Sequence, residues 1–207
     1  DYHGECVPKG GVFFLQGNSR QSTVMAVNSS FTRLRMLNTV PFLLASAQQI
    51  AAGAAIYTLF ADLDIIGCKF SDIITSAQFA VGAAIFSFSA SSFNLAHSSF
   101  ASCHLNQSDQ HGFVGGVVAL QSEYGHPVHL QVSSCNFSDL VATNGPGGAI
   151  FGFCQPLRSD RPCPQSSAFI TRSRFQQCEA LNGGAVTLSF FDLSISLASF
   201  VGNAAAS

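Results

Sequence analysis

The sequence predicts an all-β protein in which the chain winds into a parallel β-solenoid of about six coils. Three observations predict it: a short glycine-rich anchor recurs six times, each anchor is followed by a phenylalanine with a fixed apolar pattern before it, and no helix-length segment separates the copies. Strands that repeat in this way pair with their equivalents in the next coil, about 4.8 Å away.

The anchor is a pair of small residues followed by an apolar pair. Its copies start at intervals of 43, 29, 33, 32 and 36 residues, and they read Gly10-Gly-Val-Phe13, Gly53-Ala-Ala-Ile56, Gly82-Ala-Ala-Ile85, Gly115-Gly-Val-Val118, Gly147-Gly-Ala-Ile150 and Gly183-Gly-Ala-Val186. Glycine followed by a small residue is typical of a corner where the backbone takes positive φ and adjacent coils approach closely. We therefore expect one corner of every coil at this anchor.

The second element of each copy ends in a phenylalanine. These are Phe31, Phe70, Phe100, Phe137, Phe175 and Phe200. The residues seven and five positions earlier are apolar in all six copies, and the residue two positions earlier is always Ser, Cys or Ala. A spacing of two puts both apolar side chains on one face of a strand, so equivalent residues should stack into core ladders, with phenylalanine on phenylalanine.

Composition excludes several classes of protein. The 207 residues are 47% hydrophobic and 10% charged, with a net charge of −2, so the chain can bury a core and has no basic stripe for nucleic acid. Residues 36–61 carry no charge, which raises the alternative of a membrane helix, but Pro41, Gln48 and Gly53 interrupt them and favour a buried coil. We predict a single domain over residues 1–207, part of a longer chain or assembly, with no membrane span.

Cysteines and glycosylation sequons favour an extracellular or cell-surface location. The chain has seven cysteines, and its Asn-x-Ser sequons at Asn28, Asn106 and Asn136 fit a secreted glycoprotein. Cys154 and Cys163 bracket a polar, proline-rich loop and are predicted to form a disulfide.

The remaining cysteines leave pairing alternatives open. Cys68 and Cys135, like Cys103 and Cys178, share ladders two coils apart and are expected to be buried and unpaired. Cys103 and Cys135 lie on adjacent coils and remain an alternative pair, and the odd total makes Cys6 the natural free thiol.

Candidate catalytic residues are few. Asp62 and Asp64 are two apart and should share one face of a strand, whereas Asp72, Asp139 and Asp192 are expected at other phases of the coil. The histidines match no tight metal-binding rule: His126 and His129 straddle a proline, and His104 and His111 lie elsewhere. We predict no catalytic, cofactor-binding or metal-binding residue and no cofactor.

The Gly-Gly-Ala-Val186 anchor that follows Phe175, together with the Phe-x-x-Asn of Phe200 and Asn203, resembles the repeats of the polymorphic outer membrane protein family. The similarity extends over nearly the whole chain, although the other copies lack the asparagine. The resemblance implies a right-handed parallel β-helix displayed at a cell surface.

We therefore expect a non-catalytic structural or adhesive component of a surface assembly or filament. Its partners would be other subunits or copies of itself, packed end to end or laterally, and glycans, with contacts at the loops after Leu105 and Cys154. The alternative is a polysaccharide-active enzyme like the pectate lyases, which share the β-helix fold.

Overall fold

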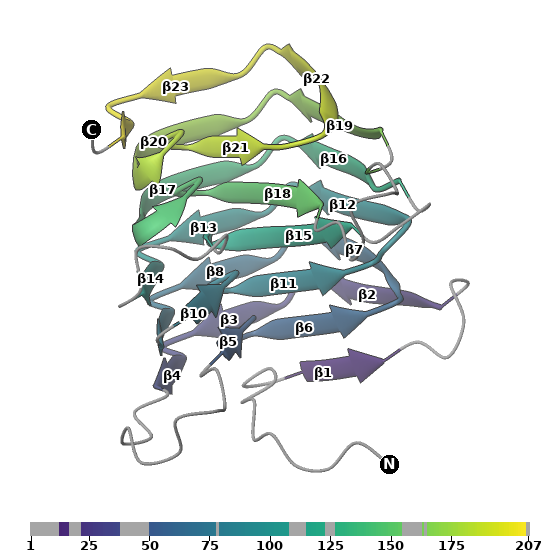
Figure 1. Ribbon diagram of the computed structural model, residues 1–207, viewed down its shortest axis with the longest axis horizontal. Helices are drawn as coiled ribbons and strands as arrows, with labels where there is room; N and C mark the ends of the chain where they lie inside the picture. The colour runs from purple at the N-terminus through teal and green to yellow at the C-terminus, as the bar shows by residue number, and fades with distance from the viewer. Residues whose placement is uncertain are drawn as a thin grey trace.

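The computed structural model describes residues 13–16, 22–37, 50–77, 79–107, 115–122, 127–154, 163 and 165–205. All regular structure in this part of the chain is β-strand, and the strands form parallel sheets. Three long sheets run the length of the molecule, from the first described strand at the bottom of Figure 1 to the last ones at the top. The all-β, parallel character expected from the repeats is therefore confirmed.

Sheet 1 consists of β1 (Phe13–Gln16), β6 (Ile56–Leu59), β11 (Ile85–Phe88), β15 (Val118–Ser122), β18 (Ile150–Cys154) and β21 (Val186–Leu188). Sheet 2 consists of β2 (Thr23–Val27), β7 (Asp62–Ile66), β12 (Ser92–Ala96), β16 (His129–Ser133), β19 (Ser166–Thr171) and β22 (Phe191–Ser196).

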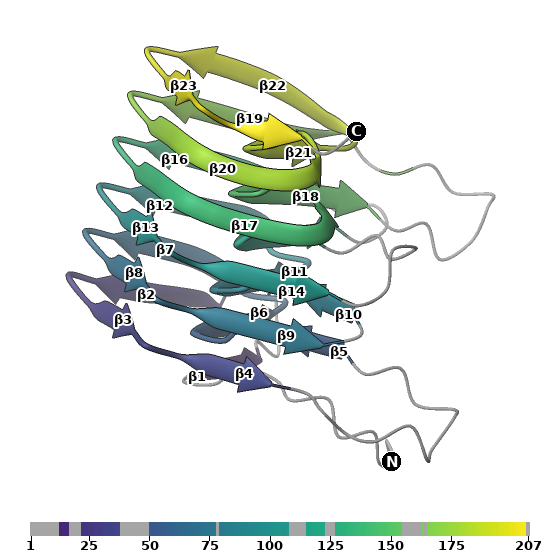
Figure 2. The same ribbon diagram turned by 90° about the vertical axis from the view of Figure 1, so that its left-hand side faces the viewer.

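Sheet 3 holds β3 (Ser30–Thr32), β4 (Arg35–Leu37), β8 (Lys69–Ser71), β9 (Ile74–Ala77), β13 (Ser99–Ala101), β14 (His104–Gln107), β17 (Asn136–Pro146), β20 (Arg174–Asn182), β23 (Ser199–Val201) and β24 (Ala204–Ala205). A two-stranded sheet joins β5 (Ile50–Ala52) to β10 (Phe79–Val81). The chain visits sheets 1, 2 and 3 in turn in every repeat, and each strand pairs with its counterpart in the next repeat (Figures 1 and 2).

The six phenylalanines form one continuous stack in the core. Phe31 pairs in register with Phe70, Phe70 with Phe100, and so on to Phe200. Neighbouring ring centroids are 4.6–5.0 Å apart and the rings are within 8° of parallel. The spacing between hydrogen-bonded strands sets this separation, so the ladder follows directly from the repeat register.

Single residues in the left-handed conformation bend the chain at the same places in every repeat. Between sheets 2 and 3 they are Asn28, Gly67, His97, Ser134, Arg172 and Leu197, and inside sheet 3 they are Arg33, Asp72, Ser102, Asp139, Gln177 and Gly202. Most are not glycine, although L-residues pay a steric penalty in this conformation. The tertiary stack therefore imposes these bends.

The glycine anchor marks a third bend, before sheet 1, as expected. Gly82 has φ +58°, and a Cβ placed there would lie 2.1 Å from the carbonyl oxygen of Ile85. The following residues, Ala83 and Ala84, are fully buried. The turn itself thus requires glycine at Gly82, and close approach of neighbouring repeats is seen at Gly148, where a Cβ would lie 2.2 Å from the carbonyl oxygen of Gly184 in the next repeat.

The small residue before each phenylalanine joins neighbouring repeats. The Ser98 hydroxyl accepts a hydrogen bond from the backbone N–H of Cys68 at 3.0 Å, and the Ser173 hydroxyl accepts one from the N–H of Cys135 at 3.2 Å. In the last repeat Asn203 has a comparable role at the bend inside sheet 3. Its Oδ1 accepts from the Cys178 N–H at 2.9 Å, and its Nδ2 donates to the Phe175 carbonyl at 3.1 Å.

The alternative Cys103–Cys135 disulfide does not form, because both cysteines are free and buried. Cys135 precedes its phenylalanine, at the bend between sheets 2 and 3, whereas Cys103 follows its phenylalanine, at the bend inside sheet 3. Adjacent repeats therefore place the two thiols at different bends. Cys6 lies outside the described residues.

The described parts of residues 36–61 lie in strands β4, β5 and β6 and in the bends next to them. In the described chain no helix has the length and apolar character needed to cross a bilayer.

Candidate functional site

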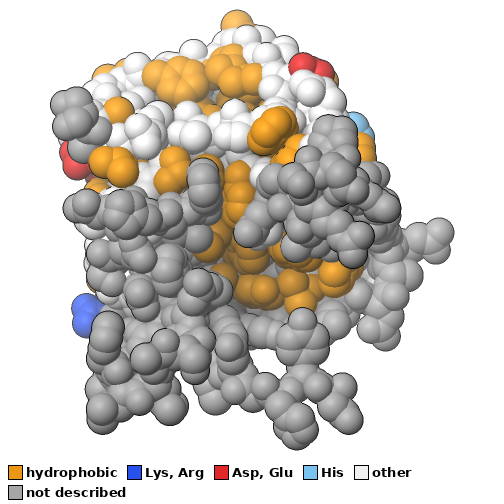
Figure 3. All heavy atoms as spheres, viewed as in Figure 1, with side chains coloured by type: hydrophobic (Ala, Val, Ile, Leu, Met, Phe, Trp, Pro, Cys, Tyr) orange, Lys and Arg blue, Asp and Glu red, His pale blue; other side chains and the backbone are white. Residues whose placement is uncertain are grey.

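The three sheets present outer faces of different chemistry. On sheet 1 the outward side chains are aromatic: Phe86, Phe151 and Phe153 are 3–8% exposed, and Tyr57 and Phe88 pack beside them. Figure 3 looks onto this face and shows hydrophobic side chains over its described surface, with charged groups only at its margins. Burial raises the pKa of Tyr57. The described part of this face is apolar and holds no ionisable pair suited to acid–base chemistry.

Sheet 2 presents a flat, mostly polar outer face, in which Asp62 and Asp64 both point outward from β7 as predicted. Asp62 has a structural role, since its Oδ1 accepts hydrogen bonds from the backbone N–H groups of Ser91 at 2.9 Å and Ser92 at 2.8 Å in the next repeat. That contact joins two repeats and satisfies backbone donors where the chain enters β12.

The expectation that Asp192 falls at an unrelated phase is wrong. The strand register puts Asp192, Ser167, His129 and Ser92 in one row across sheet 2, and the same row continues to Asp62. Three strands separate the carboxylates of Asp62 and Asp192, about 19 Å at ordinary strand spacing. Glycoside hydrolysis needs two carboxyl groups about 5–9.5 Å apart, so these two do not form such a pair.

A histidine–serine contact lies in the same row. Nδ1 of His129 is 2.8 Å from the Ser167 hydroxyl oxygen, on the exposed surface. Next to it, Nε2 of Gln165 donates to Oδ1 of Asp192 at 2.8 Å. This row was not among the candidate residues predicted from the sequence, although an alignment of the residues just before the apolar pair of each repeat reveals it.

The other three histidines considered as metal ligands lie elsewhere in the fold or outside the described residues. His104 begins β14, in sheet 3, while His111 and His126 lie outside the described residues. Within the described ranges, no three His, Cys, Asp or Glu side chains come close enough together to hold a metal ion.

Sheet 3 and its flanking bends carry the three sequons. Asn28 lies at the bend between sheets 2 and 3, Asn106 on β14 and Asn136 on β17, and all three side chains are exposed. Asn106 also faces Thr143, whose hydroxyl lies 3.5 Å from its Oδ1. All three asparagines are therefore accessible, and none of them belongs to a strand of sheet 2.

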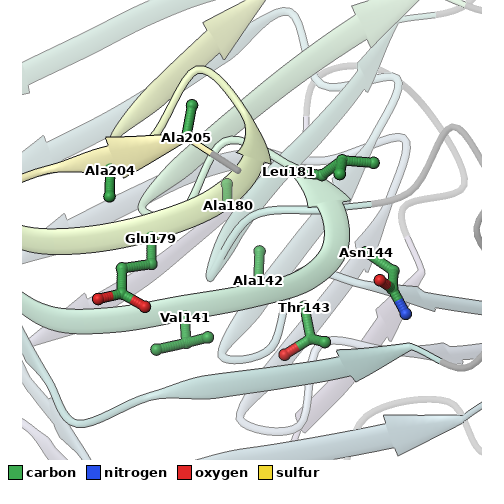
Figure 4. A pocket seen from close by; sticks show the side chains of 9 residues that line it. All are labelled: Val141, Ala142, Thr143, Asn144, Glu179, Ala180, Leu181, Ala204 and Ala205. Carbon is green, nitrogen blue, oxygen red and sulfur yellow. The ribbon is translucent and has the colours of Figure 1, made fainter. Parts of the chain in front are cut away.

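An open hollow lies over β17, β20 and β24 (Figure 4). Glu179, Thr143 and Asn144 supply its polar groups, and the other lining side chains are Val, Ala and Leu. Glu179 is the one carboxylate among the described residues that line this hollow.

Cys154 and Cys163 form the predicted disulfide, with Cα atoms 5.9 Å apart. The bond fixes the end of β18, beside Phe153 on the sheet 1 face. The contact loops predicted after Leu105 and Cys154 lie largely outside the described residues.

The buried thiols are not placed for reactivity. Burial raises the pKa of Cys103 and of Cys178 to about 12, and it raises the pKa of Cys135 as well. A nucleophilic or metal-binding cysteine needs an accessible thiolate, which these environments disfavour.

Comparison of the chain with protein-family models, with curated proteins and with solved structures gave no match.

Proposed function

We propose that this chain is a right-handed parallel β-helix of about six coils that serves as a non-catalytic structural or adhesive component of a surface assembly or filament outside the cell. The observation that carries the proposal is the uninterrupted stack from Phe31 to Phe200, surrounded by three parallel sheets in register. Such a stack makes a stiff rod with flat outer faces, suited to packing against neighbours.

The disulfide and the sequons support an extracellular location. Cys154–Cys163 is a bond typical of oxidising compartments, and Asn28, Asn106 and Asn136 are exposed acceptors. The resemblance to polymorphic outer membrane proteins points to the same location. The proposed partners are copies of this chain or other subunits, in end-to-end or lateral contact, together with glycans.

Electron microscopy of the purified protein over a range of concentrations tests the structural role. Ordered filaments or arrays are the expected result. Dispersed single rods at every concentration, without attachment to cells or matrix, would contradict it.

The enzyme alternative is tested on the same preparation with a panel of polysaccharides, assayed for new reducing ends or unsaturated products. Activity that disappears in Asp64→Ala and persists in the matched variant Asp139→Ala, which changes a carboxylate at a bend of sheet 3, would replace the structural role with an enzymatic one.

A further inference from the structure

Cations and acids are distributed differently between sheets 2 and 3, because the described cations lie in one of these sheets and its bends while the acids are divided: Asp72, Asp139 and Glu179 lie in sheet 3 or at the bend inside it. The cations in the described ranges all belong to sheet 3 or to the bends beside it: Arg33, Arg35, Lys69, Arg172 and Arg174. The outer face of sheet 2 carries Asp62, Asp64 and Asp192, and its described strands contain no Lys or Arg. One chain therefore holds an acidic face and, around the bend from it, a basic edge.

The face of sheet 2 also exposes apolar side chains. Met25, Val27 and Phe169 are 63%, 44% and 51% exposed and point outward from β2 and β19. The other large hydrophobic residues found exposed in the described chain are Phe13 and members of the last repeat. Exposed apolar groups combined with charges of one sign are typical of a protein-docking surface.

We propose that the outer face of sheet 2 docks against the basic edge of sheet 3, formed by Lys69, Arg172 and Arg174, of a second copy of this chain lying alongside. The inference rests on the proposed assembly role and names its lateral contact. Neutral and apolar groups supply most of the affinity, while the charges select the partner face.

The positions of the charges along the stack allow two ion pairs at once. Lys69 on β8 and Arg174 on β20 are three strand spacings apart, and Asp64 on β7 and Asp192 on β22 are four apart. Asp64 also lies two residues further along its strand than the row of Asp192, so the two separations are about 14 Å and about 20 Å, and the difference of about 6 Å is one that the long side chains of lysine and arginine can span. Lys69, Arg174 and Asp192 are exposed and Asp64 is half-buried, so all four remain accessible.

A second copy suits this surface because each chain carries both halves of the contact. The contact joins two different faces, so every added copy leaves one acidic face and one basic edge open, and the assembly grows until it closes into a ring or extends as an array. Asn136 lies in register beside Arg174. The contact therefore requires Asn136 to be free of glycan, and a glycan there would oppose it.

Reciprocal charge reversal tests the contact on unglycosylated protein. One variant combines Asp64→Lys with Asp192→Lys, which makes both surfaces basic; the other combines Lys69→Glu with Arg174→Glu, which makes both acidic. Arg35→Glu is the matched control, because Arg35 lies on β4, on the far side of the bend inside sheet 3 from Lys69 and Arg174. Sedimentation velocity measures association, and circular dichroism shows that each variant folds.

We expect wild-type association to weaken about tenfold between roughly 50 mM and 500 mM salt. Each reversed variant alone should stay monomeric, an equimolar mixture of the two should co-assemble, and Arg35→Glu should behave as wild type. Wild-type assemblies that both reversals leave unchanged would overturn the lateral contact and leave the proposed function standing. A wild-type chain that is monomeric under all conditions would overturn the proposed assembly role itself.

Discussion

Replacing Phe137 with alanine should remove the centre of the phenylalanine stack. Phe137 is fully buried, and its ring centroid lies 5.0 Å from that of Phe100 and 4.7 Å from that of Phe175. A buried Phe→Ala change costs about 3–5 kcal/mol, and losing two stacked neighbours places this site near 4 kcal/mol. For a chain of this length, that loss lowers Tm by about 8–16 °C.

Thermal and urea unfolding followed by circular dichroism measure the loss, with two other phenylalanines as matched controls. Phe200 is 44% exposed and stacks on Phe175 alone, so its alanine variant should lose about 1–2 kcal/mol. Phe169 points outward and is 51% exposed, so Phe169→Ala should change stability by less than about 1 kcal/mol. Equal losses at Phe137 and Phe169 would refute the ladder as the source of stability.

Three further predictions concern the disulfide, the thiols and the bends. Replacing Cys154 and Cys163 together by serine should lower the free energy of unfolding by about 2–3 kcal/mol, because the disulfide closes a segment with a sequence separation of 9. Urea unfolding under non-reducing conditions measures the loss, and no loss would mean that the closed loop does not constrain the unfolded chain. Burial raises the pKa of Cys103 to about 12, so the stability contributed by the protonated thiol is complete below the ordinary thiol pKa near 9 and is lost as pH rises toward 12. The urea unfolding midpoint should therefore fall between these pH values, and it should fall less in Cys103→Ala. His97 is exposed with φ 51°, so His97→Gly should raise the free energy of unfolding by about 0.5–1 kcal/mol in the same urea assay. Ala96→Gly, in the adjoining strand, should lower it by a similar amount, and the opposite order would show that the bend is not strained.

Repetition made the core predictable. Phe70, Phe100 and Phe137 each follow apolar residues seven and five positions earlier, and the strand period put the equivalent side chains on one face before any pairing was known. The prediction for Asp192 was wrong although the same alignment contains the information, since Asp192 directly precedes the aligned apolar position of its repeat, as Asp62 does.

The sequence left a Cys103–Cys135 disulfide open because the repeat pattern shows only that the two cysteines lie in adjacent coils. It does not say which bend a side chain occupies, and the structure places these two thiols at different bends.

The sequence by itself determined the all-β class, the stacked phenylalanines and the Cys154–Cys163 bond, because each depends on spacing along the chain. The tertiary structure alone decided which outward residues share a face. Outward positions vary from repeat to repeat, so the acidic face of sheet 2, the basic edge of sheet 3 and the buried aromatic face of sheet 1 exist only once strands from distant repeats lie side by side in register.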